Sequence, residues 1–182
     1  MARVLIVYGT TEGHTAAIAE TIAEALAEAG HETTALRAGD PPPDVPGDAD
    51  GVIVGASVHR EHHQAEVVDF VRRNLARLQA LPSAFFQVSL AAADESSEGQ
   101  TEVLGLYEAF VEETGWDPRQ HAAFAGRLAW TQYDPFTRIV MRLILRDQGL
   151  SSEELDRRRD VDYTDYDAVR RFAREFAARL PG

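Results

Sequence analysis

A short run of glycine and hydroxyl residues near the N-terminus is the part of the chain whose residue types best suit chemistry. The run from Gly9 to Thr15 follows an apolar stretch at residues 3–8 and leads directly into a helical pattern. At such a junction the backbone N–H groups of the loop and the positive end of the helix point to one place, and threonine hydroxyls add further donors. Glycines also serve tight turns for purely geometric reasons, but the position between a buried strand and a helix favours a bound phosphate.

The residues that the loop lacks indicate which phosphate-bearing ligand it binds. It has no lysine, so it differs from the nucleoside-triphosphate loop GxxxxGK[ST], and Gly9 and Gly13 do not have the spacing of the dinucleotide turn GxGxxG. Neutral donors alone suit the phosphate tail of flavin mononucleotide (FMN), which we predict as the cofactor. The predicted contacts to this phosphate are Thr10, Thr11, Gly13, His14 and Thr15. Glu12 belongs to the same predicted cofactor-binding loop, with its carboxylate pointing outward because it would repel a phosphate.

The composition narrows the class of protein. The chain has 182 residues, a formal net charge of −12 and a pI near 4.9, which argues against nucleic acid as a partner. It contains no cysteine, so redox chemistry requires a bound cofactor rather than a thiol pair or a cysteine-bound iron–sulfur cluster. All 18 basic residues are arginine, as expected from either a GC-rich genome or adaptation to high salt. The sequence shows neither a signal peptide nor an apolar run of about 20 residues, so we expect a cytoplasmic protein.

Strand and helix patterns alternate along the chain at the spacing of β–α–β units. The predicted strands cover residues 3–8, 32–37, 51–57, 83–92 and 120–129, and the predicted helices cover residues 14–29, 64–78, 101–114 and 164–180, with Thr164 as the N-cap of the last helix. We therefore predict a single α/β domain over residues 1–182. Its core is a doubly wound five-stranded parallel sheet of strand order 2-1-3-4-5, with a helical segment inserted after the fifth strand.

Three loops should meet at one edge of this sheet, because ligands of doubly wound folds bind at the carboxyl ends of the strands. These loops are residues 10–15, 57–63 and 90–99. We predict that the flavin ring lies between the second and the third loop. Its predicted contacts are Ser57, Val58 and His59 on one side and Leu90, Ala91, Ala92 and Ala93 on the other. The flavin itself then carries the chemistry, and no catalytic side chain is required.

The loop at residues 57–63 supports two other interpretations. His59 and His63 are four residues apart with Glu66 close by, as in a metal site on a helix. The run from Gly55 to His59 is also similar to the nucleophile elbow G-x-S-x-G of ester hydrolases, with histidine in place of the last glycine that the sharp turn needs. A position beside the flavin ring explains the loop better than either, and we predict no bound metal.

Several motifs carry a resemblance to known proteins. The loop GTTEGHT at residues 9–15 resembles the flavodoxin phosphate loop, with Glu12 in place of a small residue. The chain also resembles the menaquinone-dependent protoporphyrinogen IX dehydrogenases, a flavodoxin-like family, in the motifs VGASVH at 54–59, LPSAFF at 81–86, AGRL at 125–128 and VDYTDY at 161–166. The similarity runs in order through nearly the whole chain. It implies an FMN enzyme that passes electrons from protoporphyrinogen IX through FMN to menaquinone.

The inserted segment, at about residues 130–160, is the part that short flavodoxins lack. Within residues 135–148, Arg138, Arg142 and Arg146 recur every four positions and form a basic stripe on an otherwise apolar helical pattern. Such a stripe suits peripheral contact with the inner face of the cell membrane or a flat anionic ligand, and equally a docked helix whose arginines pair with carboxylates. For the family reaction, the candidate contacts to the substrate propionates are Arg127, Arg138 and Arg142.

Two other classes of function stay open. A flavodoxin-type FMN electron carrier, without a substrate of its own, is favoured by the acidic composition, whereas the arginine-striped insert favours the enzyme. A flavin-free structural or regulatory module is the third class, and purified protein without the yellow colour of a flavin would indicate it.

Overall fold

The structure is a computed structural model that describes residues 1–11, 13–39, 41–59, 62–128 and 161–181. The chain divides into two compact units, Met1–Gly126 with Thr164–Gly182, and Arg127–Tyr163. In the second unit, strands β7 (Arg127–Leu128) and β8 (Val161–Asp162) form an antiparallel pair. The predicted helix at residues 135–148 lies outside the described residues, and the single-domain organisation stays a prediction.

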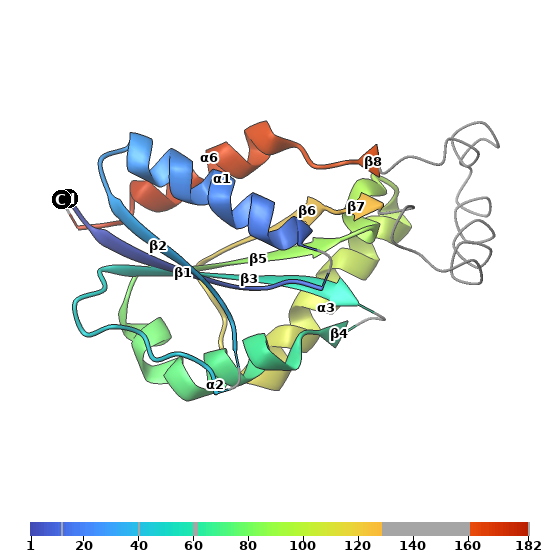
Figure 1. The fold of residues 1–182 in the computed structure, drawn as a ribbon. Helices are drawn as coiled ribbons and strands as arrows, with labels where there is room; N and C mark the ends of the chain where they lie inside the picture. Colours follow the sequence, from blue (N-terminus) through green and yellow to red (C-terminus); the bar gives the residue numbers. More distant parts are fainter. Residues whose placement is uncertain (12, 40, 60–61, 129–160, 182) are drawn as a thin grey trace. The chain divides into compact units, whose positions relative to one another are not determined.

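The first unit is built on a parallel sheet whose main strands lie in the order β2-β1-β3-β5-β6 (Figure 1). These strands are β1 (Arg3–Gly9), β2 (Glu32–Arg37), β3 (Gly51–His59), β5 (Ser83–Ser89) and β6 (Gln120–Ala125). The short strand β4 (His62–His63) pairs antiparallel with the end of β3 and lies off this path. Without β4, the strand order is the predicted 2-1-3-4-5, so the doubly wound α/β fold is confirmed.

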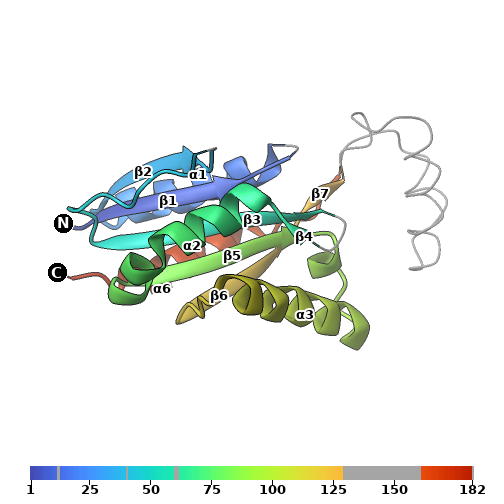
Figure 2. The same cartoon turned by 90° about the horizontal axis from the view of Figure 1, so that it is seen from below.

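Helices cover both faces of this sheet (Figures 1 and 2). One face carries α1 (His14–Glu28) and α6 (Tyr166–Ala177), and the other carries α2 (Ala65–Ala80) and α3 (Ser97–Thr114). The interior strand β5 supplies both cores, because Phe85 packs in the cluster with α2 and α3 while Phe86 packs in the cluster with α1 and α6. Successive side chains of a strand point to opposite faces, so a strand buried on both sides needs a continuous apolar run. Among the described helices, none has the length and apolar character needed to cross a membrane.

Two predicted helix starts differ from the structure. Helix α6 begins at Tyr166, and its N-cap is Asp165, whose carboxylate accepts hydrogen bonds from the backbone N–H groups of Asp167 and Ala168. The prediction of Thr164 as the cap was therefore wrong, and the Thr164 hydroxyl instead donates to the carbonyl of Ala125 at 2.8 Å. Helix α3 begins earlier than expected, because the hydroxyl of Ser96 caps it by accepting from Gly99 N–H.

Two predicted strands end early. Strand β5 stops at Ser89, and Ala91–Ala93 form a 3₁₀ turn, η1, that the sequence had assigned in part to the strand. The predicted strand over 120–129 divides into β6 and β7, since Gly126 N–H bonds to the carbonyl of Ser89 and the chain beyond it pairs with β8.

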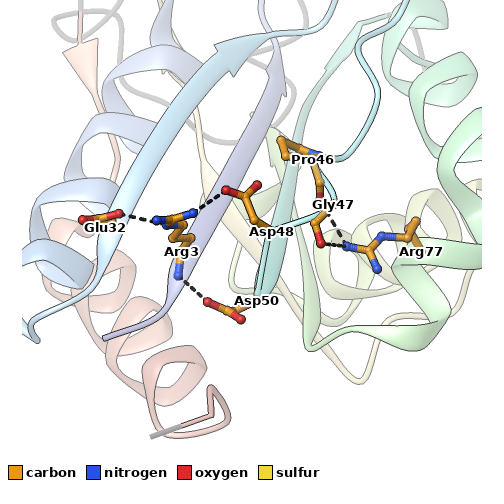
Figure 3. A network of polar contacts seen from close by, with 7 residues as sticks. All are labelled: Arg3, Glu32, Pro46, Gly47, Asp48, Asp50 and Arg77. Atoms are coloured by element: carbon orange, nitrogen blue, oxygen red, sulfur yellow. Dashed lines mark hydrogen bonds and ion pairs between the residues drawn. The ribbon is translucent and has the colours of Figure 1, made fainter.

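An exposed ion-pair network holds the amino ends of the strands together (Figure 3). The guanidinium of Arg3 contacts Glu32 at 3.2 Å and also Asp48, and its backbone N–H donates to the carboxylate of Asp50 at 2.8 Å. These contacts link β1 to the start of β2 and to the segment before β3. They lie at the amino end of β1, whereas the loops with predicted ligand contacts follow the carboxyl ends of the strands. Exposed ion pairs of this kind add little to stability. The network therefore serves mainly to position the start of β2 and the segment before β3 relative to β1.

Candidate functional site

The loop after β1 has the backbone geometry of an anion site. Gly13 is the N-cap of α1 and has a φ of 83°, a left-handed conformation that favours glycine. Its backbone N–H donates to the hydroxyl of Thr10 at 2.9 Å, which closes the loop in front of the helix. The guanidinium of Arg37, at the end of β2, donates to the carbonyl of Thr10 at 3.0 Å and holds the other side of the loop. The first-turn N–H groups of α1, which have no partners within the helix, therefore open toward this loop.

Thr15 tests whether the loop fits a phosphate. Its side chain is 1% exposed, and its hydroxyl oxygen finds no hydrogen-bond partner among the described residues. A buried hydroxyl without a partner is unfavourable by about 1–3 kcal/mol, so this group calls for a partner that the described residues do not supply. A phosphate in front of the α1 N-terminus would accept this hydrogen bond. The residues present therefore fit the phosphate of a flavin.

Gly9 is required by the close approach of α2 to the loop. A Cβ atom at this position would lie 2.5 Å from Cγ2 of Val67 and 2.9 Å from Oε1 of Gln64. Such distances are well inside van der Waals contact. Gly9 thus allows the start of α2 to pack directly against the end of β1.

Gln64 is a site residue that the sequence analysis missed. Its side-chain amide contacts the hydroxyl of Ser57 and lies 3.4 Å from the hydroxyl of Thr11, so it joins the phosphate loop to the predicted ring loop. Its Oε1 is buried and has no partner among the described residues. The only signal in the sequence was its place at the N-cap of α2, between two segments predicted to converge.

The segment predicted as the first ring loop is partly a β-hairpin. Strand β3 continues to His59 and turns back as β4, with Val58 opposite His63 and His59 opposite His62. Ser57 and Val58 are half-buried at the end of β3, as a ring contact requires. The side chain of His59 lies outside the described set.

His63 is directed away from solvent and into the α3 core. Its imidazole lies with ring centroids 4.9 Å from Phe110 and 5.7 Å from Phe85, and its Nε2 lies 3.1 Å from Oε1 of Gln87. Burial lowers the pKa of His63, and the hydrogen bond with Gln87 offsets part of that change. The neutral ring therefore anchors the hairpin to the core.

The second ring segment follows β5, the neighbour of β3. Leu90, Ala91 and Ala92 are half-buried around η1, and the N–H of Ala92 bonds to the hydroxyl of Ser89 at 3.2 Å. The strand register places Ser57 of β3 beside Val88 of β5, so both ring segments leave the same edge of the sheet. Hydrogen bonds from Ser96 lower the pKa of Asp94, which follows η1.

The structure thus brings most of the predicted cofactor residues to one edge of the sheet. Those at that edge are Thr10, Thr11, Gly13, His14, Thr15, Ser57, Val58, Leu90, Ala91, Ala92 and Ala93. Glu12, Arg138 and Arg142 lie outside the described residues, as does the side chain of Arg127. Whether these side chains contact a ligand stays a prediction.

Comparison with known proteins agrees with this geometry. The flavodoxin domain family matches residues 5–154. The chain belongs to the flavodoxin domain family. It is 35% identical over 180 residues to a protoporphyrinogen IX dehydrogenase [quinone] of Leishmania major, covering 96% of this chain and 74% of that protein. It is 32% identical over 179 residues to the protein of the same name from Escherichia coli K12, covering 96% of this chain and 94% of that protein. The family resemblance read from the sequence is confirmed.

Solved structures agree on the fold. Oxidised flavodoxin 1 from Bacillus cereus is 14% identical with a TM-score of 0.55, over 99% of this chain and 100% of that one. The flavodoxin of Streptococcus pneumoniae TIGR4 is 18% identical with a TM-score of 0.55, over 97% of this chain and 99% of that one. The flavodoxin domain indicates that this flavodoxin-like protein uses a flavin cofactor.

Proposed function

We propose that this flavodoxin-domain protein binds FMN and oxidises protoporphyrinogen IX with a quinone, of the menaquinone type, as electron acceptor. The observation that carries the FMN part is the buried, unpartnered hydroxyl of Thr15 at the N-terminus of α1. Together with the Thr10 and Thr11 hydroxyls and the first N–H groups of α1, it offers the neutral donors that a phosphate monoester needs.

The reaction follows from the relatives, which bear the name protoporphyrinogen IX dehydrogenase [quinone]. Conversion of the porphyrinogen to the porphyrin releases six electrons and six protons, which three quinones take up to become quinols. The bound flavin supplies the chemistry that accepts and returns these electrons. The protein's own part is to hold and shield the reactants. We assign the ring contacts to Ser57, Val58 and His59 on one side and to Leu90–Ala93 on the other.

The insert completes the proposal. We assign contacts with the substrate propionates to Arg127, Arg138 and Arg142, because arginine binds carboxylates bidentately. Residues 135–148 would also bring the protein to the inner face of the cell membrane, where menaquinone is dissolved.

Anaerobic incubation of FMN-loaded protein with protoporphyrinogen IX and a menaquinone analogue tests the proposal. Porphyrin fluorescence should rise only when the quinone is present. The control is the same mixture with apoprotein, which accounts for spontaneous oxidation. Fluorescence that does not depend on quinone would exclude the enzyme.

An FMN electron carrier is the second candidate, favoured by the charge of the chain. Between residues 94 and 118 the chain has eight acidic side chains and no basic one, as expected of a surface that docks basic redox partners. Deletion of residues 130–160 separates the two candidates. A carrier would keep electron exchange with a flavodoxin reductase, whereas the dehydrogenase would keep FMN but lose porphyrin formation.

A further inference from the structure

A cavity of about 410 Å³ lies between α3 and the carboxyl halves of β5 and β6, beside η1. Figure 2 shows α3 beside the edge strand β6. The cavity is lined by Gln87, Ala92, Asp94, Gln100, Val103, Leu104, Tyr107, His121, Ala122 and Ala123. Its size is at the lower end of the range, about 300–1,000 Å³, of small-molecule sites. Because Ala92 is also a predicted ring contact, the cavity adjoins the candidate flavin site.

The walls of the cavity are mainly apolar, and its rim is incomplete. Leu104 is 52% exposed, one of few large apolar side chains with such exposure among the described residues. Among the other lining residues, His121 stacks on Tyr107 with ring centroids 3.9 Å apart and an interplanar angle of 18°. These flat and aliphatic surfaces suit a planar apolar ligand.

Several polar side chains line the cavity, and most of them already have hydrogen-bond partners: Asp94 accepts from Ser96 N–H, and Gln100 donates to the carbonyl of Glu95. The Tyr107 hydroxyl is occupied, since it donates to Asp117 at 2.8 Å. Gln87 is also occupied, by His63 and by the carbonyl of Val103. His121 has no hydrogen-bond partner in the described part of the chain, so its ring can donate to a carbonyl oxygen of a ligand.

The surrounding charge selects against an anion. Asp94 lines the cavity, and α3, which forms one wall, carries glutamates but no arginine. A porphyrinogen, which carries carboxylates, would be repelled here, whereas a neutral quinone would not. Reduction of a quinone consumes two electrons, which the porphyrinogen supplies, and two protons, which solvent supplies at the open rim.

We propose that this cavity between α3 and β6 binds the ring of the neutral quinone acceptor, and that the porphyrinogen binds elsewhere. The inference rests on the proposed function, because it assigns a place to one of the two substrates. Apart from Ala92, the lining residues lie outside the predicted cofactor contacts, and they include the half-buried Ala123 and the exposed Leu104.

Substitution of Ala123 by phenylalanine tests the proposal in the FMN-loaded full-length protein. Ala123 is half-buried on the same face of β6 as His121, so the larger ring fills the cavity, and phenylalanine suits a strand. Leu104→Gln is a second, surface variant that does not threaten folding. Leu36→Gln is the matched control, because Leu36 is an exposed leucine of β2, at the opposite edge of the sheet.

The probe is menadione, a soluble naphthoquinone. We expect Ala123→Phe to raise both its KM and its Kd from equilibrium dialysis at least tenfold, and Leu104→Gln to raise them severalfold. The FMN affinity and the KM for protoporphyrinogen should not change in either variant, and Leu36→Gln should match wild type throughout. Unchanged menadione binding in both variants, or a raised porphyrinogen KM, would overturn the inference and leave the proposed function intact. Wild-type protein that binds FMN and menadione without forming porphyrin would instead contradict the proposed function alone.

Discussion

The imidazole Nε2 of His14 lies 2.7 Å from the hydroxyl oxygen of Thr164, a residue 150 positions later in the chain. Because the hydroxyl donates its only proton to the carbonyl of Ala125, the N–H at Nε2 of His14 must be the donor in this contact. These two hydrogen bonds form a relay from His14 through Thr164 to Ala125. The relay connects the first residue of α1 with the two segments that come directly before and after residues 127–163 in the sequence. The side chain of His14, predicted as a phosphate contact, has this structural role, while its backbone N–H remains part of the α1 N-terminus.

Replacing Thr164 by valine should loosen the phosphate loop. The variant keeps the shape of the side chain but removes both hydrogen bonds, so we expect a loss of about 1–2 kcal/mol in the free energy of unfolding. FMN affinity should fall severalfold because the N-terminus of α1 loses the hydrogen bond between His14 and Thr164 that holds it in place. Urea unfolding and flavin fluorescence titration measure the two effects. Thr164→Ser retains the hydroxyl and should match wild type, and an unchanged affinity in the valine variant would show that the relay does not support the loop.

Replacing Thr15 by valine should separate cofactor binding from stability. The hydroxyl has no partner among the described residues, so its removal should leave the apoprotein as stable as wild type or more stable. A hydrogen bond to a charged phosphate contributes about 1.5–3 kcal/mol, so the FMN dissociation constant should rise about 10- to 100-fold. Thermal unfolding of the apoprotein and flavin titration of the same samples report the two quantities.

The matched control for this experiment is Thr21→Val, in the same helix. The hydroxyl of Thr21 is buried and donates to the carbonyl of Ala17 at 3.0 Å. Its loss should lower stability by about 1 kcal/mol without changing FMN affinity. If Thr15→Val behaves like this control, the phosphate assignment is wrong.

The architecture could be predicted from the sequence because each element carries its own local signal. The apolar run of β5 places Phe85 and Phe86 on opposite faces, and this pattern indicates a strand buried on both sides whatever its neighbours are. Gly30, with a φ of 86°, ends α1 by a similarly local rule. Strand order followed from the chemistry of the first loop and from the rule for ligand position in doubly wound sheets.

The details that the sequence did not reveal depend on contacts between distant residues. Thr164 and Asp165 are both good N-caps, and only the partner of Thr164 at Ala125 determines which of them caps α6. Gln64 resembles any polar residue ahead of a helix until Thr11 and Ser57 are found on either side of it. The cavity at His121 was equally invisible, because it requires the packing of α3 on β6.

Stability should depend on pH through His63. Burial, its largest influence, lowers the pKa of His63 in the native state; Gln87 and Glu113 raise it, and His62 lowers it further. Below the ordinary histidine pKa of about 6.5 the unfolded chain then binds more protons than the native state, so stability must fall as the pH decreases. We expect the free energy of unfolding to stay level above about pH 7 and to decrease between about pH 7 and about pH 5, with a smaller decrease in His63→Asn. The exposed neighbour His62 provides the control variant His62→Asn. It should keep most of the wild-type slope, because His62 is the smallest of the four influences on the pKa of His63, and an identical slope in all three proteins would exclude His63 as the cause.

Adding one methyl group at Gly55 should damage the core, because Phe86 fills the space that the methyl would need. A Cβ at Gly55 would lie 2.1 Å from Cζ of Phe86, and the two residues are paired in the register of β3 and β5. The Phe86 ring has little room to move, since Phe124 and Phe172 pack beside it with centroids at 5.9 Å and 6.4 Å. Overpacking of this kind costs about 1–3 kcal/mol or more, and we expect Gly55→Ala to lie at the upper end of that range.

A second glycine variant, Gly105→Ala, shows whether this cost comes from packing or from a general effect of replacing glycine. Gly105 lies within α3, and a Cβ there would meet no atom within 4 Å. Alanine should therefore stabilise the protein by about 0.5–1 kcal/mol through the helix backbone. Chemical unfolding of both variants should give opposite signs. Equal stability of Gly55→Ala and wild type would mean that β3 and β5 separate easily at this register, which their burial on both faces argues against.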